Sequence, residues 1–238
     1  QELQVYLDRL SAVESAGISG GWTNRVTLSA DDEWNGSNVS ETRATEICED
    51  LAGGVLPPSM QVEKVYLIDY PWPPGTSPEG AHPEKPEARE DLLDAIDRGC
   101  STLIFFGHGS YNQIAQENLL STLDIPSMSN LPRLPIAFFA SCNTGQFDLL
   151  GTDCFSEALV NHPQGGAVTA IGSSYGSYTY QNEDLLNAFL EYQYGSQRAT
   201  VGEALWGAKV MASDDHNYYY NIMGDGGFTA PMGDDGET

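Results

Sequence analysis

The chain has 238 residues, which is enough for one large domain with a substantial core. Ten lysines and arginines stand against 34 aspartates and glutamates, giving a net charge of −24. This balance argues against nucleic acid and anionic membranes as partners, because phosphate binding needs a basic patch. No apolar run reaches the ~18 residues that a membrane helix requires, so membrane insertion is not expected.

In chain order, the hydrophobic pattern predicts a helix over 2–14, a strand over 26–30, a helix over 40–51 capped by Ser40, and a strand around 65–68. Prolines and glycines predict a long loop over 71–88. The remaining elements are a helix over 89–98, the strand "TLIFF", a fourth strand in "LPIAFFASC", a helix from 155, a fifth strand in "GGAVTAIGSS", and helices over 183–192 and 201–211.

These strands are continuous apolar runs that alternate with helices. The pattern is typical of an α/β fold, with a mostly parallel sheet flanked by helices on both faces in a three-layer sandwich. Functional sites of such sheets lie at the carboxyl ends of the strands. There is no GxGxxG after the first strand and no P-loop, so a nucleotide cofactor has no support.

The acidic residues are spread through the chain, with local density in "ADDEW", "REDLLDAIDRG" and "MGDDGET". The simplest interpretation is a solvated surface suited to high salt. Calcium carriage by some of these carboxylates is the alternative. The four cysteines form no CxxC pair, which argues against zinc. We therefore expect no required cofactor and no metal at the site, with a structural calcium as the one ion the acids could carry.

The third strand ends in "IFFGHGSYN", where His108 stands between two glycines. A histidine at a strand end is most often a surface or structural residue. Glycines, however, allow tight turns and close approach of other backbones. They leave the imidazole at the edge of the sheet, and its pKa near neutrality suits proton transfer.

The fourth strand ends in a similar way, with Cys142 followed by "NTG". The 34 residues between His108 and Cys142 leave room for one crossover between neighbouring parallel strands. A thiol beside an imidazole is the minimum for a cysteine nucleophile, and backbone N–H groups of the glycine turn can receive an oxyanion. The alternative is a buried, inert thiol. Two matched strand ends favour the nucleophile.

The segments "FFGHGS", "FFASCNTGQFD", "CFSEALV" and "GGAVTAIGSSYGSY" resemble the gingipain-type cysteine peptidases of family C25, which share the caspase-like fold. "TVGEALWGAK" and "YYYNIMGDGG" resemble the C-terminal segments of that family. The likeness runs from about Trp22 to Gly226. The chain departs from the family at the last motif, which usually reads G-D-P and here reads G-D-G.

The resemblance implies roles for single residues. Cys142 matches the nucleophile and His108 the catalytic histidine, while Gly109 and Cys142 match the backbone oxyanion donors. Asp31, with Asp32 as its neighbour, is the best match for the acid that orients the histidine; the alternative is a solvated turn. The candidate substrate-binding wall lies in "GSSYGSYTY" and includes Ser173, Ser174, Tyr175 and Tyr178, although this aromatic run could simply pack the loop.

The resemblance also implies a domain organisation. Family members carry another α/β subdomain upstream, which this sequence lacks. Residues 1–21 are therefore expected to be a helix and linker leading in from that subdomain. Residues 22–228 are expected to form the caspase-like catalytic domain, and residues 229–238 an acidic flexible tail. Additional domains are expected in the full-length protein.

The predicted function is a secreted or cell-surface cysteine endopeptidase that forms a thioester acyl-enzyme on protein or peptide substrates. One alternative uses the same chemistry for transpeptidation, as in type IX secretion sortases. A second is an inactive binding module on the caspase-like scaffold. A third is a structural domain with a Cys142–Cys154 disulfide. Substrate preference is not readable, and a basic preference is only suggested by the family.

Overall fold

The computed structural model describes residues 2–16, 20–32, 42–76, 83–195 and 198–232. Its centre is a six-stranded sheet in the order β2-β1-β3-β7-β8-β9. The strands are β1 (Arg25–Ala30), β2 (Gln61–Tyr66), β3 (Thr102–Phe106), β7 (Ile136–Ala140), β8 (Thr169–Ser173) and β9 (Tyr220–Gly224). All neighbours are parallel except β9, which runs antiparallel to β8. The prediction of a mostly parallel sheet is confirmed.

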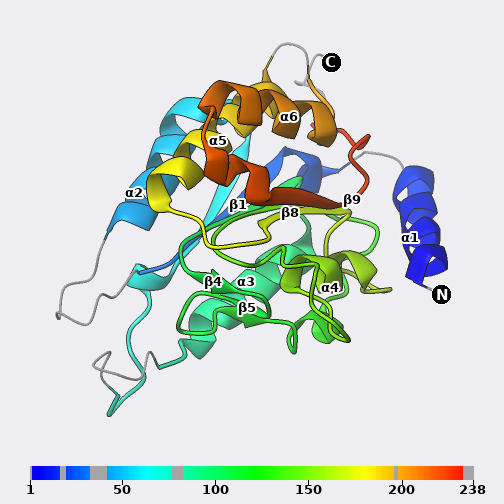
Figure 1. The fold of residues 1–238 in the computed structure, drawn as a ribbon. Coiled ribbons are helices and arrows are strands. Elements are labelled where there is room, and N and C mark those ends of the chain that lie inside the picture. Colours follow the sequence, from blue (N-terminus) through cyan, green and yellow to red (C-terminus); the bar gives the residue numbers. More distant parts are fainter. Residues whose placement is uncertain (1, 17–19, 33–41, 77–82, 196–197, 233–238) are drawn as a thin grey trace.

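Helices cover both faces of this sheet, as Figure 1 shows. On one face lie α2 (Arg43–Asp50), α5 (Thr179–Tyr194) and α6 (Val201–Ala212), and on the other α3 (Pro86–Arg98) and α4 (Phe155–Asn161). Successive strand residues point to opposite faces. Phe138 therefore belongs to the first core and Phe139 to the second, and both are fully buried.

The N-terminal helix α1 (Glu2–Ala16) packs against α4 and is anchored by one buried side chain. Arg9 donates hydrogen bonds to the carbonyl oxygens of Val160, Gly165 and Ala167. Burial lowers the pKa of Arg9 to about 10, which still leaves it charged at neutral pH. The helix predicted over 2–14 thus exists and is fastened to the body of the domain.

The differences from the predicted elements have local causes. The second strand spans 61–66 rather than 65–68, because its exposed edge positions carry charged residues that hide the pattern, and residues 67–69 form a 3-10 turn. Helix α3 begins at Pro86, inside the predicted loop, since proline suits the first helical position. The predicted cap Ser40 lies outside the described residues. A single π-helical turn, Leu51–Val55, extends α2.

The crossover between β3 and β7 contains no α-helix among its described residues. It forms a small antiparallel sheet of β4 (Gly109–Ser110), β5 (Gln113–Ile114) and β6 (Leu120–Ser121). This sheet starts directly at the glycine after His108. None of the described helices is long and apolar enough to cross a membrane.

Candidate active site

Three neighbouring strands end side by side and bring the predicted residues to one edge of the sheet. Ala30 pairs with Phe106, and Phe106 pairs with Ala140. His108 and Cys142 each lie two residues beyond the last paired position of β3 and β7. Asp31 follows directly after β1. The structure therefore brings the predicted histidine, nucleophile and acid together, as expected for adjacent parallel strands.

The two glycines around His108 are required by close contacts. Gly107 has φ +152°, and a Cβ atom there would collide with the side chain of Asp31. A Cβ atom at Gly109 would lie 2.8 Å from Ser141 Oγ and 2.9 Å from the carbonyl oxygen of Cys142. The backbone after His108 thus passes against the backbone of the candidate nucleophile.

Asp31 holds the main chain of the histidine. Its Oδ2 atom accepts a hydrogen bond from the main-chain N–H of His108 at 2.8 Å. Asp31 is buried, whereas His108 is exposed. This contact fixes the position of the His108 backbone, from which the imidazole extends. That Asp31 also orients the imidazole ring stays a prediction.

Asp32 faces a different partner. Its Oδ2 atom lies 2.8 Å from Lys85 Nζ, and both side chains are almost fully buried. Lys85 also donates to the carbonyl oxygen of Leu67 at 2.7 Å and lies 4.0 Å from the ring centroid of Trp72. Asp31 and Asp32 therefore accept hydrogen bonds from different donors, although their carboxylates lie close together.

Cys142 differs from the other three cysteines in exposure. Cys48, Cys100 and Cys154 are buried, while Cys142 is half-buried, and all four thiols are free, so the Cys142–Cys154 disulfide alternative is wrong for this structure. Burial raises the pKa of Cys100 to about 11 and that of Cys154 to about 12, and it also raises the pKa of Cys48. Cys142 is therefore the most accessible of the four thiols.

The turn after Cys142 is locked to the loop after β8. Asn143 has φ +58°, a conformation that asparagine tolerates better than most residues, and its N–H donates to the carbonyl oxygen of Tyr175 at 3.2 Å. The N–H of Gly145 donates to the carbonyl oxygen of Ser173 at 2.9 Å. A Cβ atom at Gly145 would lie 2.5 Å from the carbonyl oxygen of Gly172, which explains the glycine in "NTG".

The predicted substrate-binding residues divide into two groups. Tyr175 and Tyr178 are exposed and Ser174 is half-buried, so all three reach the surface beside Cys142. Ser173 is buried, and its hydroxyl donates to the carbonyl oxygen of Tyr175 at 2.8 Å. Ser173 therefore shapes the loop from inside.

A surface cavity of about 310 Å³ lies next to this turn. The rings of Tyr175 and Tyr219 form one side of it, with centroids 5.4 Å apart. Its other lining residues are Phe147, Asp148 and Ser174. Sequence reasoning missed Phe147 and Asp148, although both stand within "SCNTGQFD", a few residues after the nucleophile.

The described residues also include one buried group of carboxylates at the same edge. Oxygen atoms of Asp31, Asp32 and Glu117 lie within 4.8 Å of one another. Glu117 comes from the turn between β5 and β6. Carboxylate oxygens are calcium ligands, so this group is where the predicted structural calcium would fit, with Lys85 already supplying one positive charge.

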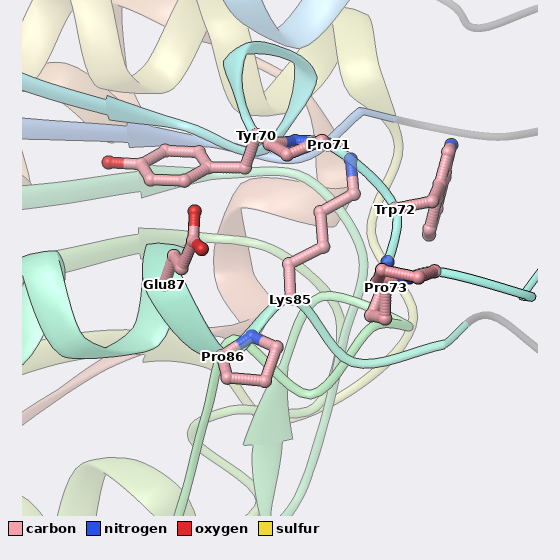
Figure 2. Close-up of a pocket in the computed structure, with 8 residues that line it drawn as sticks. Tyr70, Pro71, Trp72, Pro73, Lys85, Pro86 and Glu87 are labelled. Atoms are coloured by element: carbon pink, nitrogen blue, oxygen red, sulfur yellow. The ribbon is translucent and has the colours of Figure 1, made fainter.

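A second cavity, of about 230 Å³, is lined by residues 70–74, after β2, and by residues 85–87 at the start of α3. Figure 2 shows the Lys85 side chain reaching from the start of α3 towards Pro71 and Trp72, with Glu87 near the ring of Tyr70. The walls come from the proline-rich segment that the sequence indicated only as a loop. The Pro-Trp-Pro-Pro run at 71–74 was the available signal for an ordered apolar wall.

Comparisons with known proteins bear on the family and the fold. A family model described as peptidase family C25 matches residues 1–230. A solved structure described as "Crystal structure of the Arg specific cysteine proteinase gingipain R (RGPB)" superimposes with a TM-score of 0.69 at 19% identity, covering 96% of this chain and 52% of that one. Another, described as "Structure of Protease", gives a TM-score of 0.71 at 19% identity, covering 97% of this chain and 54% of that one.

A more distant likeness is to a Saccharomyces cerevisiae separase–securin complex, with a TM-score of 0.52, 12% identity, and coverage of 85% of this chain and 12% of that one. Gingipain and separase are both caspase-like, so the predicted fold class is confirmed. This chain spans about half the length of the gingipain structure. No curated protein matches it in sequence.

Proposed function

The chain belongs to peptidase family C25, and on that basis we propose that it is a cysteine endopeptidase that uses Cys142 and His108. One observation carries the proposal. Cys142 is the only one of the four thiols that is not buried, and it follows a strand paired with β3, which ends two residues before His108. The likeness to gingipain R supports the same chemistry.

In the proposed reaction, the Cys142 thiolate attacks the scissile carbonyl carbon and forms a tetrahedral intermediate. The N–H groups of Gly109 and Cys142 would receive its oxyanion. Protonated His108 then gives its proton to the leaving amine, and a thioester remains on Cys142. Neutral His108 next takes a proton from water, the hydroxide attacks the thioester, and the thiolate and a carboxylic acid product are released.

Asp31 would support this cycle by fixing the position of His108 and stabilising its charged form. The buried carboxylate accepts from the histidine main chain at 2.8 Å, so it lies within reach of charge that develops on this residue. An acid in this role stabilises imidazolium without being protonated itself. Removing its charge should weaken catalysis and leave the nucleophile in place.

Substrate side chains would bind along Ser174, Tyr175 and Tyr178 and in the cavity that contains Asp148. Aromatic faces and a carboxylate together suit a cationic side chain. Gingipain R, which this chain resembles in structure, is described as an Arg-specific proteinase. We therefore propose peptides with a basic residue as the first substrates to test. Membership of family C25 also supports a secreted or cell-surface location.

The test is hydrolysis of a fluorogenic peptide library, with products identified by mass spectrometry. We expect cleavage at internal bonds, a preference for basic residues, and no turnover by Cys142→Ala. Full activity in Cys142→Ala would refute the assignment. Adding an amine nucleophile distinguishes the sortase-like alternative, since a transpeptidase would give mainly the coupled product. No turnover of any peptide and no reaction with peptidyl probes would favour the binding module.

A further inference from the structure

The sulfur of Cys142 is held by one residue of the loop between β8 and α5. The main-chain N–H of Ser177 points at Sγ at 3.3 Å, and the thiol donates to the carbonyl oxygen of Ser177 at 3.3 Å. The hydroxyl of Ser177 also points at Sγ, at 3.9 Å. Sulfur hydrogen bonds are longer than those of oxygen because the atom is larger. Ser177 thus provides two donors to the candidate nucleophile.

A buried chain of hydrogen bonds continues behind Ser177. Asn182 Nδ2 donates to Ser177 Oγ at 3.1 Å, and the hydroxyl of Tyr220 donates to Asn182 Oδ1 at 2.7 Å. Asn182 lies in the first turns of α5 and is 4% exposed, and Tyr220 opens β9 and is 1% exposed. The ring of Tyr220 stacks on Phe138 of β7 at 5.6 Å, so its hydroxyl is rigidly placed.

Each hydrogen bond in this series is donated in the direction of the Cys142 sulfur. The hydroxyl of Tyr220 donates its hydrogen bond to Asn182 Oδ1, and this contact directs the amide nitrogen of Asn182 towards Ser177. That amide occupies a lone pair of the serine oxygen and leaves the serine proton for Sγ. Burial raises the pKa of Tyr220, so the phenol stays a donor at any pH at which the protein would work. Aligned hydrogen bonds of this kind strengthen one another.

We propose that Ser177, Asn182 and Tyr220 form a relay that orients the Cys142 sulfur and stabilises its thiolate from the side of β8 and β9. The inference rests on the proposed function, because it gives the relay a purpose in cysteine chemistry. Ser177 contacts the reacting atom itself. Asn182 and Tyr220 act through it and are positioning residues.

The relay is separate from the histidine in the fold. His108 approaches from the end of β3, on one side of β7, whereas the relay comes from β8, α5 and β9 on the other. Besides His108 and Tyr220, titratable groups around the Ser177 loop include Tyr175 and Tyr178, Tyr219 against the ring of Tyr175, and His216, which contacts Tyr178 at a ring distance of 4.9 Å and pairs with Asp214. Substitutions at Ser177 or Asn182 leave all of these side chains in place.

The experiment measures the rate of iodoacetamide alkylation of Cys142 against pH, with the modified peptide quantified by mass spectrometry. The variants are Ser177→Ala, Asn182→Ala and Tyr220→Phe. Removing donors makes the thiolate less stable, so the midpoint of the profile should rise by about half a pH unit to one unit. In peptide hydrolysis, kcat should fall roughly fivefold with KM little changed.

Tyr194→Phe is the matched control. It also removes a hydroxyl from a tyrosine. This hydroxyl lies 2.6 Å from Thr102 Oγ1, at the amino-terminal end of β3, whereas Cys142 lies beyond the carboxyl end of β7. It should lower the melting temperature without moving the alkylation midpoint. Tyr220→Phe keeps the ring and its packing, and Ser177→Ala changes only a loop side chain, so at least these two variants should fold.

An unchanged midpoint in Ser177→Ala and Tyr220→Phe would overturn the relay and leave these residues with a packing role. The result is independent of the proposed function. Activity that survives in Cys142→Ala would refute the peptidase assignment, while the alkylation profile of Cys142 would still show whether the relay acts on the thiol.

Discussion

The Oδ2 atom of Asp31 accepts a hydrogen bond of 2.8 Å from the main-chain N–H of His108, so the end of β1 holds the end of β3. The neighbouring carboxylate, Asp32, is instead paired with buried Lys85 at 2.8 Å. Two consecutive aspartates therefore have different physical tasks. One fixes the candidate catalytic histidine and the other neutralises a buried ammonium group.

Asp31→Asn and Asp32→Asn should consequently separate catalysis from stability. Asp31→Asn keeps an oxygen for the His108 N–H but loses the charge, so turnover should fall by about 10² to 10⁴-fold without vanishing. Asp32→Asn removes the carboxylate that lies 2.8 Å from buried Lys85 and should cost about 1–3 kcal/mol of the free energy of unfolding, since the carboxylates of Asp31 and Glu117 remain nearby. Peptide hydrolysis and urea unfolding measure the two effects.

The reverse result, with Asp32→Asn as the variant that loses turnover without losing stability, would assign the catalytic acid to Asp32. If neither variant changed turnover, Cys142 and His108 would act as a dyad. Asp31 would then serve only to anchor the backbone.

His108→Ala should lower turnover by at least ~100-fold, the usual scale of general acid–base catalysis. Alkylation of Cys142 near neutral pH should also slow, because the imidazolium no longer stabilises the thiolate. His162→Ala is the control. His162 follows the last residue of α4, and its Nε2 atom lies 3.0 Å from the carbonyl oxygen of Met128. Equal alkylation rates in His108→Ala and wild type would show that His108 does not act on the thiol.

Gly109→Ala tests the close approach beside the nucleophile. The added Cβ would meet Ser141 Oγ at 2.8 Å and the Cys142 carbonyl oxygen at 2.9 Å, so the Cys142 backbone must shift. A displacement of this kind should lower kcat by about 10²-fold. Gly53→Ala, where a Cβ meets nothing within 4 Å, should leave kcat unchanged. Equal kcat values in the two variants would mean that the backbone at Gly109 has no part in the chemistry.

The net charge of −24 should make the protein more stable in salt. Self-repulsion is screened as the Debye length shrinks from ~10 Å at 0.1 M to ~3 Å at 1 M ionic strength. The melting temperature, measured by calorimetry, should therefore rise with NaCl over this range. A flat or falling trend would remove the argument for adaptation to salt.

Calcium and magnesium at matched ionic strength extend this measurement to the buried carboxylates. A calcium ion held by Asp31, Asp32 and Glu117 should raise the melting temperature above that in magnesium, because an ion that binds only the folded state stabilises it. Glu117→Gln should abolish the difference. Equal melting temperatures in the two ions would leave screening as the only effect of added cations.

Much of the fold could be predicted because the central strands are buried on both faces. β3 and β7 are continuous apolar runs, so their bounds and the parallel pairing followed from the sequence. The two edge strands, β2 and β9, were harder to predict from the sequence. β2 mixes exposed charges with buried residues, and β9 follows a 3-10 turn in a tyrosine-rich segment with no clear period.

The candidate site was predictable to a similar degree. His108 and Cys142 stand out because glycines and a turn follow apolar strands, and the register then brings them to one edge. The partners that act through space were not predictable. Nothing local links Lys85 to Asp32, Tyr220 to Asn182, or Ser177 to Cys142, since those contacts join residues 53, 38 and 35 positions apart in the chain.

The central claim is that Cys142 is the nucleophile of a cysteine peptidase, and covalent capture tests it most directly. The protein should be incubated with a thiol-reactive peptidyl ketone carrying a basic residue, and its intact mass and modified peptide measured. We expect one added group per chain, located on Cys142, absent in Cys142→Ala and slower to form in His108→Ala. Modification at another residue, or hydrolysis of peptides that continues after Cys142 is fully blocked, would contradict the account.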